Sequence, residues 1–298
     1  MNALASFTPI LAVSVGSLLY LVTGRALERR HRAASVAALL IAAAMVLLCR
    51  IPDSIGESEY GFVVNDFSRL FAMMACLGAL LSVVSTAGAA EREGIGTINE
   101  YYFLLLTSLA GAMVMVFATD YLSLFIGVEV ASLALYCLCG SRVSQRSGSE
   151  ASMKYFLLGC FSSAFLLLGI AFWYGATGSL SMVVQDEVPY NTMVFLSFLM
   201  VLVGMAFKLG LAPFHLWVPD VYQGAPTSVT TFMSCIVKVA AFGALLKVLV
   251  LGYVYPQAWS MSSLWLLAAL AMTVGNLAAL QQRSVKRMLA YSSVAQAG

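Results

Sequence analysis

The stretch FKLGLAPFHLWVPDVYQGAP, residues 207 to 226, interrupts a long apolar run with charge and proline. Lys208 stands five residues before Pro213, and two further prolines follow. Proline removes a backbone donor and breaks a helix, and broken backbone at membrane depth is tolerated only inside protein or against water. With His215 and Asp220 nearby, the stretch predicts a broken helix beside a polar cavity. The alternative is a kinked helix followed by a loop, with His215 at the membrane interface.

The composition around this stretch is that of a membrane protein. The chain has 298 residues, of which 61% are hydrophobic and 10% charged, and its mean hydropathy is +0.91. A soluble domain carries about 25% charged residues. The net charge of +2 argues against a nucleic-acid partner. Residues 1–8 lack the basic segment of a cleavable signal peptide, so we expect the first apolar run to be a span.

Apolar runs predict an all-α polytopic fold with about nine to ten transmembrane helices, because about 20 apolar residues cross a bilayer. The run 101–140 is too long for one crossing, and Thr119-Asp120 is the expected turn within it. A tenth span begins near Val285. The nine complete candidates are 9–24, 33–49, 67–87, 101–119, 121–140, 152–175, 191–212 (the broken helix), 228–252 and 258–280.

Charges between the spans predict the orientation of the chain. Basic residues gather in the connections 25–32, 142–146 and 283–287, whereas acidic residues dominate 50–65 and 180–190. Connections rich in Lys and Arg stay in the cytoplasm. The alternation therefore predicts that the N-terminus lies outside the cytoplasm.

Three charged residues lie near the middle of three different apolar runs: Glu129, Lys208 and Lys238. A charge at the bilayer centre costs about 2.5–3.5 kcal/mol on insertion scales, and such residues usually mark ion or proton pathways. A carboxylate and two amines are groups that hold and release protons. Proton or ion movement is therefore the leading hypothesis, and the alternative is that these charges are structural, Glu129 in a buried pair.

Three further residues are candidates for proton transfer. Lys247 follows Lys238 by nine residues on the same run and either relays protons or extends its amine to the outer interface. Lys154 begins the sixth span, where it acts as a relay or as an interfacial anchor. His215 titrates near neutral pH and is suited to shuttling protons. The chain shows no Gly-rich phosphate loop and no metal-site spacing.

Long motifs in this chain resemble the antiporter-like membrane subunits of respiratory complex I. The most specific is the run from Phe207 to Gly243, FKLGLAPFHLWVPDVYQGAPTSVTTFMSCIVKVAAFG. Supporting stretches are DYLSLFIGVEVASLALY, ASMKYFLLGCFSSAFLLLGIAFWYGATGSL and NLAALQQRSVKRMLAYSSVAQAG. The resemblance covers residues 100–298, and residues 1–99 fit it only in hydropathy.

The resemblance implies an inverted-repeat antiporter-like fold and a division of the chain. Residues 1–99 would form helices 1–3, residues 100–254 the half-channel of helices 4–8, and residues 255–298 the start of the second repeat, helices 9–10. Chains of this family continue beyond the tenth helix, so we expect this one to be C-terminally truncated. It also carries Gln296 where many relatives have histidine. Matched residue by residue, the family's proton-transfer groups correspond to Glu129, Lys208 with Pro213 and His215 beside it, Lys238, and Lys154.

The activity that the resemblance implies is proton translocation in an NADH:quinone oxidoreductase of the bacterial inner membrane. Breaking and forming a Glu129–Lys208 pair would change the proton affinity of Lys208, since a 4 Å ion pair is worth about 4 kcal/mol at an effective dielectric of about 20. We expect no cofactor in this chain, with NADH, FMN, iron–sulfur clusters and quinone in partner subunits. The expected partners are other complex I membrane subunits, lipid and protons. The rival hypotheses are a cation/proton antiporter subunit of the Mrp kind and a non-conducting assembly scaffold.

Overall fold

The structure is a computed structural model that describes residues 2–23, 30–51, 61–90, 92–142, 145–183, 191–252 and 258–298. Eight helices in these ranges are long and apolar enough to cross a membrane, and Phe7–Val22 is a shorter apolar helix. The helices are α1 (Asn2–Thr23), α2 (Arg30–Arg50), α3 (Asp66–Ala89), α4 (Ile98–Phe117), α5 (Tyr121–Cys139), α6 (Arg146–Thr177), α7 (Thr192–Leu209), α8 (Trp217–Gly224), α9 (Thr227–Phe232), the π-helix η2 (Met233–Val237), α10 (Lys238–Gly252), α11 (Ala258–Leu280) and α12 (Val285–Ala297).

The predicted spans match these helices one by one, with α9, η2 and α10 together forming the eighth. The predicted turn inside 101–140 is confirmed, because α4 ends at Phe117 and α5 begins at Tyr121. There the Asp120 carboxylate accepts a hydrogen bond from the Ser123 amide at 2.7 Å and caps α5. Of the predicted connections 25–32, 50–65 and 180–190, residues 25–29, 52–60 and 184–190 lie outside the described residues.

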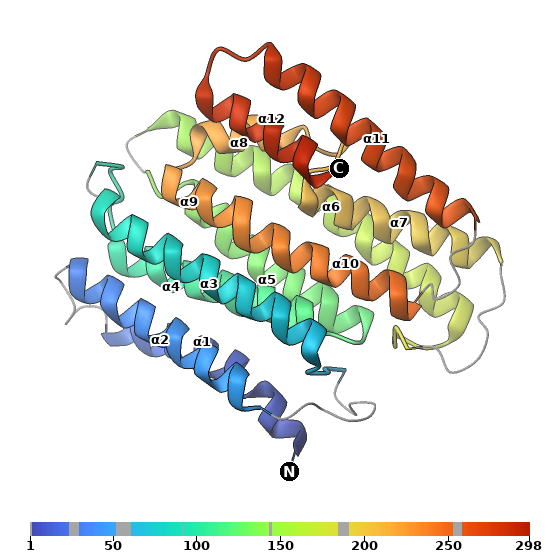
Figure 1. Ribbon diagram of the computed structural model, residues 1–298, viewed down its shortest axis with the longest axis horizontal. Coiled ribbons are helices and arrows are strands. Elements are labelled where there is room, and N and C mark those ends of the chain that lie inside the picture. The colour runs from blue at the N-terminus through green and yellow to red at the C-terminus, as the bar shows by residue number, and fades with distance from the viewer. Residues whose placement is uncertain are drawn as a thin grey trace.

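Helix ends alternate between the two ends of the bundle. In Figure 1, α1, α3, α5 and α11 finish at the upper-left end, where α2, α4, α6, α9 and α12 begin. The connections that the sequence shows to be basic therefore lie at the same end of the bundle, as far as their residues are described. The arginines at this end that lie in the described residues are Arg30, Arg32, Arg92, Arg142, Arg146, Arg283 and Arg287.

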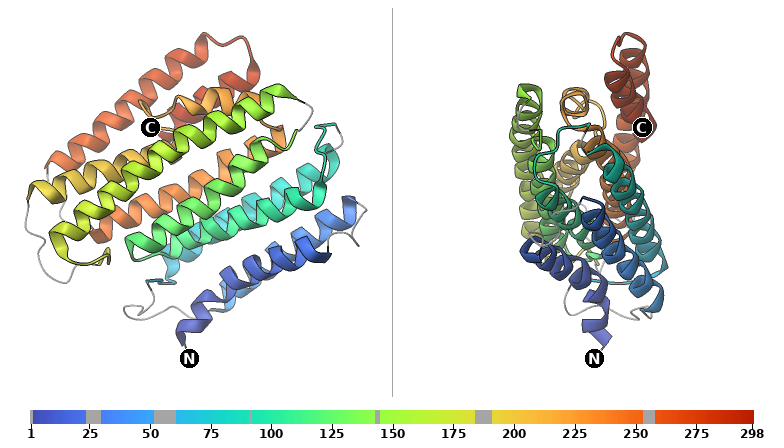
Figure 2. Two further views of the ribbon diagram at one scale, coloured as in Figure 1. Left: turned by 180° about the vertical axis from the view of Figure 1, so that it is seen from behind. Right: turned by 90° about the vertical axis from the view of Figure 1, so that its left-hand side faces the viewer.

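The helices lie side by side, so that the bundle is extended across the helix axes, with α1 and α2 at one edge and α11 at the other (Figures 1 and 2). Between them, α4 packs against α1, α3, α5 and α10. Gly111 of α4 and Gly127 of α5 face each other so closely that a Cβ on Gly111 would lie 2.5 Å from the Ala131 amide nitrogen. Small residues of this kind allow membrane helices to approach. This contact fixes α5, which carries Glu129, against the buried centre of the bundle.

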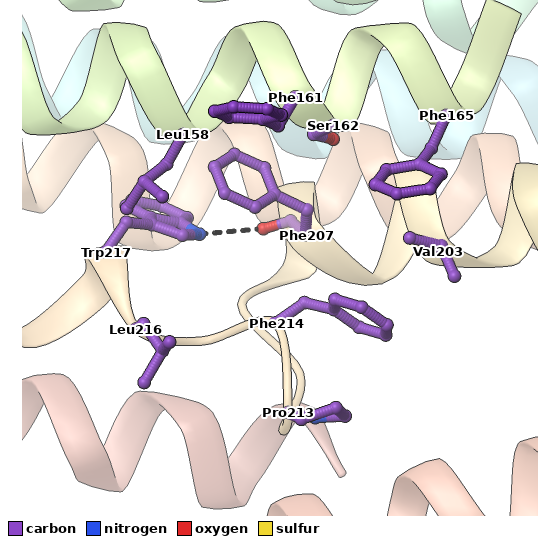
Figure 3. Close-up of a pocket in the computed structure, with 10 residues that line it drawn as sticks. All are labelled: Leu158, Phe161, Ser162, Phe165, Val203, Phe207, Pro213, Phe214, Leu216 and Trp217. Carbon is purple, nitrogen blue, oxygen red and sulfur yellow. Dashed lines mark hydrogen bonds between the residues drawn. The ribbon is translucent and has the colours of Figure 1, made fainter.

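The helix break is confirmed, and it lies just after Lys208. α7 ends at Leu209, Gly210 adopts φ of +70°, and α8 begins seven residues further on at Trp217. Glycine enters this left-handed conformation without strain and commonly terminates helices. The indole Nε1 of Trp217 donates at 2.9 Å to the Phe207 carbonyl, which also accepts from the Gly210 amide, and so ties the start of α8 to the end of α7 (Figure 3).

The eighth span contains a π-helical turn that the sequence did not predict. Residues Met233–Val237 form it, and Lys238 is the first residue of the α-helix that follows. Such turns occur mostly inside α-helices and are frequent at functional sites. The irregularity therefore lies directly before one of the candidate proton-transfer residues.

Candidate functional site

Lys208 lies at the end of α7 and is almost completely buried, with 3% of its surface exposed. Its Nζ donates to the Ser132 hydroxyl at 2.8 Å and to the Tyr136 hydroxyl at 3.4 Å, both on α5. The Tyr136 and Phe207 rings lie 5.8 and 5.7 Å from the amine, within the range of cation–π attraction. The groups that contact the amine directly are thus neutral.

Glu129 lies one helical turn before Ser132 and is half-buried. Its Oε1 accepts a hydrogen bond from the Ser163 hydroxyl of α6. Among the ion pairs between described residues, none joins Glu129 to Lys208, although the carboxylate is close enough to act on the amine electrostatically. The Glu129–Lys208 pair therefore stays a prediction for another state of the protein, because the two groups, both in described residues, do not form an ion pair in this structure.

Lys238 is 8% exposed and binds to α12. Its Nζ donates to the Ser293 carbonyl at 2.7 Å and to the Ser293 hydroxyl at 2.6 Å. Nine residues later, Lys247 is 6% exposed and donates to the carbonyls of Val116 and Phe117, each at 3.0 Å. Those carbonyls belong to the last turn of α4, where a cation is favoured by the helix dipole. The amine of Lys247 is turned into the protein.

Lys154 belongs to a network of charges at the basic end of the bundle. Its Nζ contacts Glu150 at 2.8 Å and Asp220 at 2.9 Å. Asp220, on α8, also contacts Arg287 of α12 at 2.7 Å. The hydrogen bond from Lys154 is the main reason that the pKa of the Asp220 carboxyl lies below its ordinary value, and Arg287 adds to it. The network ties α6, α8 and α12 together at one end.

His215 lies in the break between α7 and α8 and is 8% exposed. The centre of its ring is 6.1 Å from that of Tyr291 on α12. Pro213 is exposed and, with Phe207 and Trp217, lines an apolar pocket of about 180 Å³ between α6 and the break (Figure 3). The break therefore has an apolar side, and the buried polar partners of Lys208 come from α5.

The structure does not bring the six candidate residues into one cluster. Glu129 and Lys208 lie near each other, whereas Lys238, Lys247 and Lys154 each bind elsewhere. The sequence did not single out the serines: Ser132, Ser163 and Ser293 supply the contacts of three candidates. One signal was available for Ser132, because it follows Glu129 by three residues and so shares its helix face. Asp66 and Arg69, three residues apart at the start of α3, form an ion pair at 3.0 Å.

Comparisons with known proteins agree with this arrangement. Residues 118–298 match the family described as NADH:quinone oxidoreductase/Mrp antiporter, transmembrane. The chain is 44% identical over 243 residues to the NADH-quinone oxidoreductase subunit N of Trichlorobacter lovleyi, which covers 79% of this chain and 50% of the relative. It is 37% identical to subunit N 1 of Sorangium cellulosum, over 98% of this chain and 63% of the relative. The similarity therefore also includes residues 1–99, whereas the sequence motifs showed it only for residues 100–298.

Solved structures show the same fold. A chain in respiratory complex I from Thermus thermophilus with bound aureothin superposes with a TM-score of 0.83 and 37% identity, over 97% of this chain and 62% of that one. A chain of the Mrp complex from Dietzia, at 23% identity and a TM-score of 0.82 over 99% of this chain and 57% of that one, shares the fold. This chain spans about half to two thirds of the length of the relatives named here. It belongs to the family of NADH:quinone oxidoreductase and Mrp antiporter transmembrane proteins.

Proposed function

We propose that this chain is a subunit of the N type in a proton-pumping NADH:quinone oxidoreductase, in which it conducts protons across the membrane. The relatives named subunit N support this assignment, as does the DVYQGAPTSVTTFM motif of residues 220–233. NADH, FMN, iron–sulfur clusters and quinone would bind in other subunits of the complex. Coupling would reach this chain through its contacts with neighbouring membrane subunits.

The observation that carries the proposal is the environment of the buried lysines. Lys208, Lys238 and Lys247 are each less than 10% exposed, and their amines are bound by hydroxyl or carbonyl oxygens. An amine donates hydrogen bonds whether it is charged or neutral, and a neutral oxygen accepts from both forms. These sites therefore permit a proton to be taken up and released without breaking the packing around it.

The Glu129–Lys208 pair would supply the control. A carboxylate close to an amine favours its charged form, so movement of Glu129 would change the proton affinity of Lys208. Lys238 would receive the proton on its way toward the second repeat. Lys154 and His215 would connect the proton pathway to the basic end of the bundle. Lys247 would either relay protons or cap the C-terminal end of α4. The division into residues 1–99, 100–254 and 255–298 belongs to this proposal.

We assign the chain to the bacterial inner membrane with its basic end in the cytoplasm and its N-terminus outside. The support is the gathering of arginines at one end of the bundle, as the positive-inside rule expects. A cysteine placed at position 146 should react with an impermeant thiol reagent only from the cytoplasmic side. Labelling from the outer side would reverse the assigned orientation.

The test of the function is proton uptake per NADH oxidised in membranes that carry the complex. Glu129→Gln and Lys208→Ala should lower this ratio strongly, because each removes a charge from the proposed switch. Glu100→Gln is the matched control, since Glu100 is an exposed carboxylate at the start of α4. Normal pumping in both Glu129→Gln and Lys208→Ala would exclude the proposed pathway.

The rival functions predict different results in the same membranes. A cation/proton antiporter would collapse an imposed pH gradient when Na⁺ is added, without NADH, and the Glu129→Gln change would abolish that response. A non-conducting scaffold would lose assembly of the complex on deletion but would tolerate both Glu129→Gln and Lys208→Ala. The proton pump is favoured over both because the relatives at 37–44% identity are NADH-quinone oxidoreductase subunits.

A further inference from the structure

The two charges of the proposed switch are each held by a serine, and the two serines belong to different helices. Ser132 on α5 accepts from Lys208, and Ser163 on α6 donates to Glu129. Glu129 and Ser132 are three residues apart on α5, so their side chains project from the same face about 5–6 Å apart at Cβ. A change of rotamer is therefore enough to move the carboxylate from Ser163 toward the amine that Ser132 binds.

The hydroxyl of Ser132 is oriented as an acceptor. Its single proton is donated to the Val128 carbonyl, four residues earlier on α5. A serine hydroxyl has one proton and two lone pairs, so the oxygen remains free to accept from Lys208 Nζ at 2.8 Å. Ser132 thus holds Lys208 in place whether or not a carboxylate is near.

The hydroxyl of Ser163 has two alternative acceptors for its single proton. One is Glu129 Oε1, and the other is the Gly159 carbonyl of its own helix, at 3.1 Å. A buried donor without an acceptor is costly. Ser163 avoids that cost in both positions of Glu129, because its proton turns to Gly159 when the carboxylate leaves.

The turn of α6 at Gly159 faces the Lys208 site directly. A Cβ at Gly159 would overlap the Tyr136 hydroxyl, and that hydroxyl accepts from Lys208 at 3.4 Å. The alternative acceptor of Ser163 and a ligand of Lys208 therefore meet at the same residue. The hydrogen bond between Ser163 and Glu129 is formed within this site.

We propose that Ser163 is the positioning residue of Glu129: its hydrogen bond holds the carboxylate away from Lys208, and its release to Gly159 lets the Glu129–Lys208 pair form. The proposal deepens the proposed function, since it names the group that sets how often the pair is made. Ser163 takes up no proton in this step. The only changes are the acceptor of its hydroxyl proton and the rotamer of Glu129.

The test measures the coupling between Glu129 and Lys208 with and without Ser163. The full chain in detergent carries Glu129→Gln, Lys208→Met or both, and deviation of the melting temperatures from additivity reports the interaction. With Ser163 present, the deviation should be small, because the carboxylate is held elsewhere. In the Ser163→Ala background it should grow to several degrees, because the freed carboxylate pairs with the amine.

Ser162→Ala is the matched control. Ser162 is the neighbouring residue on α6 and donates to the Gly204 carbonyl of α7 at 3.1 Å, so its loss removes a hydroxyl from the same turn without touching Glu129. Ser163→Thr, which keeps the hydroxyl, should behave as the native chain does. Equal coupling in the native, Ser163→Ala and Ser162→Ala backgrounds would overturn the proposal.

A second readout keeps the proposal testable if Ser163→Ala lowers the yield of folded chain. Ser163→Cys nearly preserves the side-chain volume and weakens the hydrogen-bond donor. The infrared band of the Glu129 carboxylate, identified by its loss in Glu129→Gln, should shift in the Ser163→Cys variant because the hydrogen bond is lost. An unshifted band would contradict the proposal. Neither measurement requires pumping, so the two proposals can fail separately. If the Glu129–Lys208 coupling energy is the same with and without Ser163 and the complex pumps as proposed, only the role of Ser163 is rejected. If that coupling energy changes but Glu129→Gln and Lys208→Ala pump normally, only the proposed function is rejected.

Discussion

Lys208 and Lys247 are buried to nearly the same degree, but their partners are of different kinds. Lys208 is bound by the side chains of Ser132 and Tyr136 on another helix. Lys247 is bound by two backbone carbonyls at the end of α4. A side chain can change its rotamer without movement of the backbone, whereas a helix end moves only with its helix. Lys208 therefore lies in a site that can be rearranged, and Lys247 lies in a fixed one.

Burial of a charge in a membrane protein is thus compatible with two roles. Intramembrane lysines are usually read as parts of a pathway, and Lys208 fits that expectation. Lys247 fits the role of a cap, because a cation near the last carbonyls of a helix is stabilising. The nature of the acceptor distinguishes the two roles better than depth or exposure does.

Replacing each lysine by methionine should give the largest contrast. Lys208→Met should slow proton transfer through this chain by about 100-fold or more, the usual rate effect of a proton-transfer group, and so lower proton uptake per NADH. Lys247→Met should keep most of the pumping but destabilise the chain by about 1–3 kcal/mol, because the Val116 carbonyl loses its donor, whereas the Phe117 carbonyl still accepts from the Val63 amide. Abolished pumping in Lys247→Met with an unchanged melting temperature would reverse the comparison.

A smaller contrast is expected between Ser132→Ala and Ser293→Ala. The first leaves Lys208 with the Tyr136 hydroxyl at 3.4 Å, and the loss of a hydrogen bond to a charged group costs about 1.5–3 kcal/mol. The second leaves Lys238 with the Ser293 carbonyl at 2.7 Å, so its melting temperature should fall less. Thermal unfolding of the two variants in detergent measures the difference. A larger loss in Ser293→Ala would show that backbone acceptors do not compensate for side chains here.

The smallest effect should come from Asp220→Asn, at about 1 kcal/mol or less, because partly exposed ion pairs contribute little. Lys154 and Arg287 hold the pKa of Asp220 below its ordinary value. The carboxylate therefore stabilises the fold above about pH 4, and this contribution is lost as the pH falls through the lowered pKa. Melting curves of the native chain and the Asp220→Asn variant should differ at about pH 7 and converge once the pH falls below the lowered pKa of Asp220. A gap that persists in acid would show that the charge of Asp220 is not the cause.

Much of the fold could be predicted from the sequence because hydropathy is a local property. The span limits, the turn before Tyr121 and the break after Lys208 each follow from a few adjacent residues. The pair of Asp66 and Arg69 also follows, since residues three apart on a helix share a face. Glu129 and Lys208 were recognisable as candidates because charge is rare at that depth.

The partners of these charges could not be predicted in the same way. Ser163 contacts Glu129 only because α6 packs beside α5 with a particular rotation. Serine is common in membrane helices and satisfies its hydroxyl on its own backbone, so no local signal separates Ser163 from Ser162. The π-turn at Met233–Val237 could not be predicted either, because the residues MSCIV carry no proline, glycine or other signal that distinguishes a π-turn from an α-helical turn.

That π-turn also bears on how the eighth span tolerates changes in length. A π-turn holds about one residue more than an α-helical turn, and here it stands between Phe232 and Lys238. Deleting one residue from 233–237 would remove that extra residue, so an unbroken α-helix could form with Lys238 still on the face that meets Ser293. Deleting one residue from 239–246 instead would rotate everything after it by about 100°, one residue's share of an α-helical turn. The two shortened chains would look alike in any hydropathy profile, yet only the second would turn Lys247 away from the end of α4.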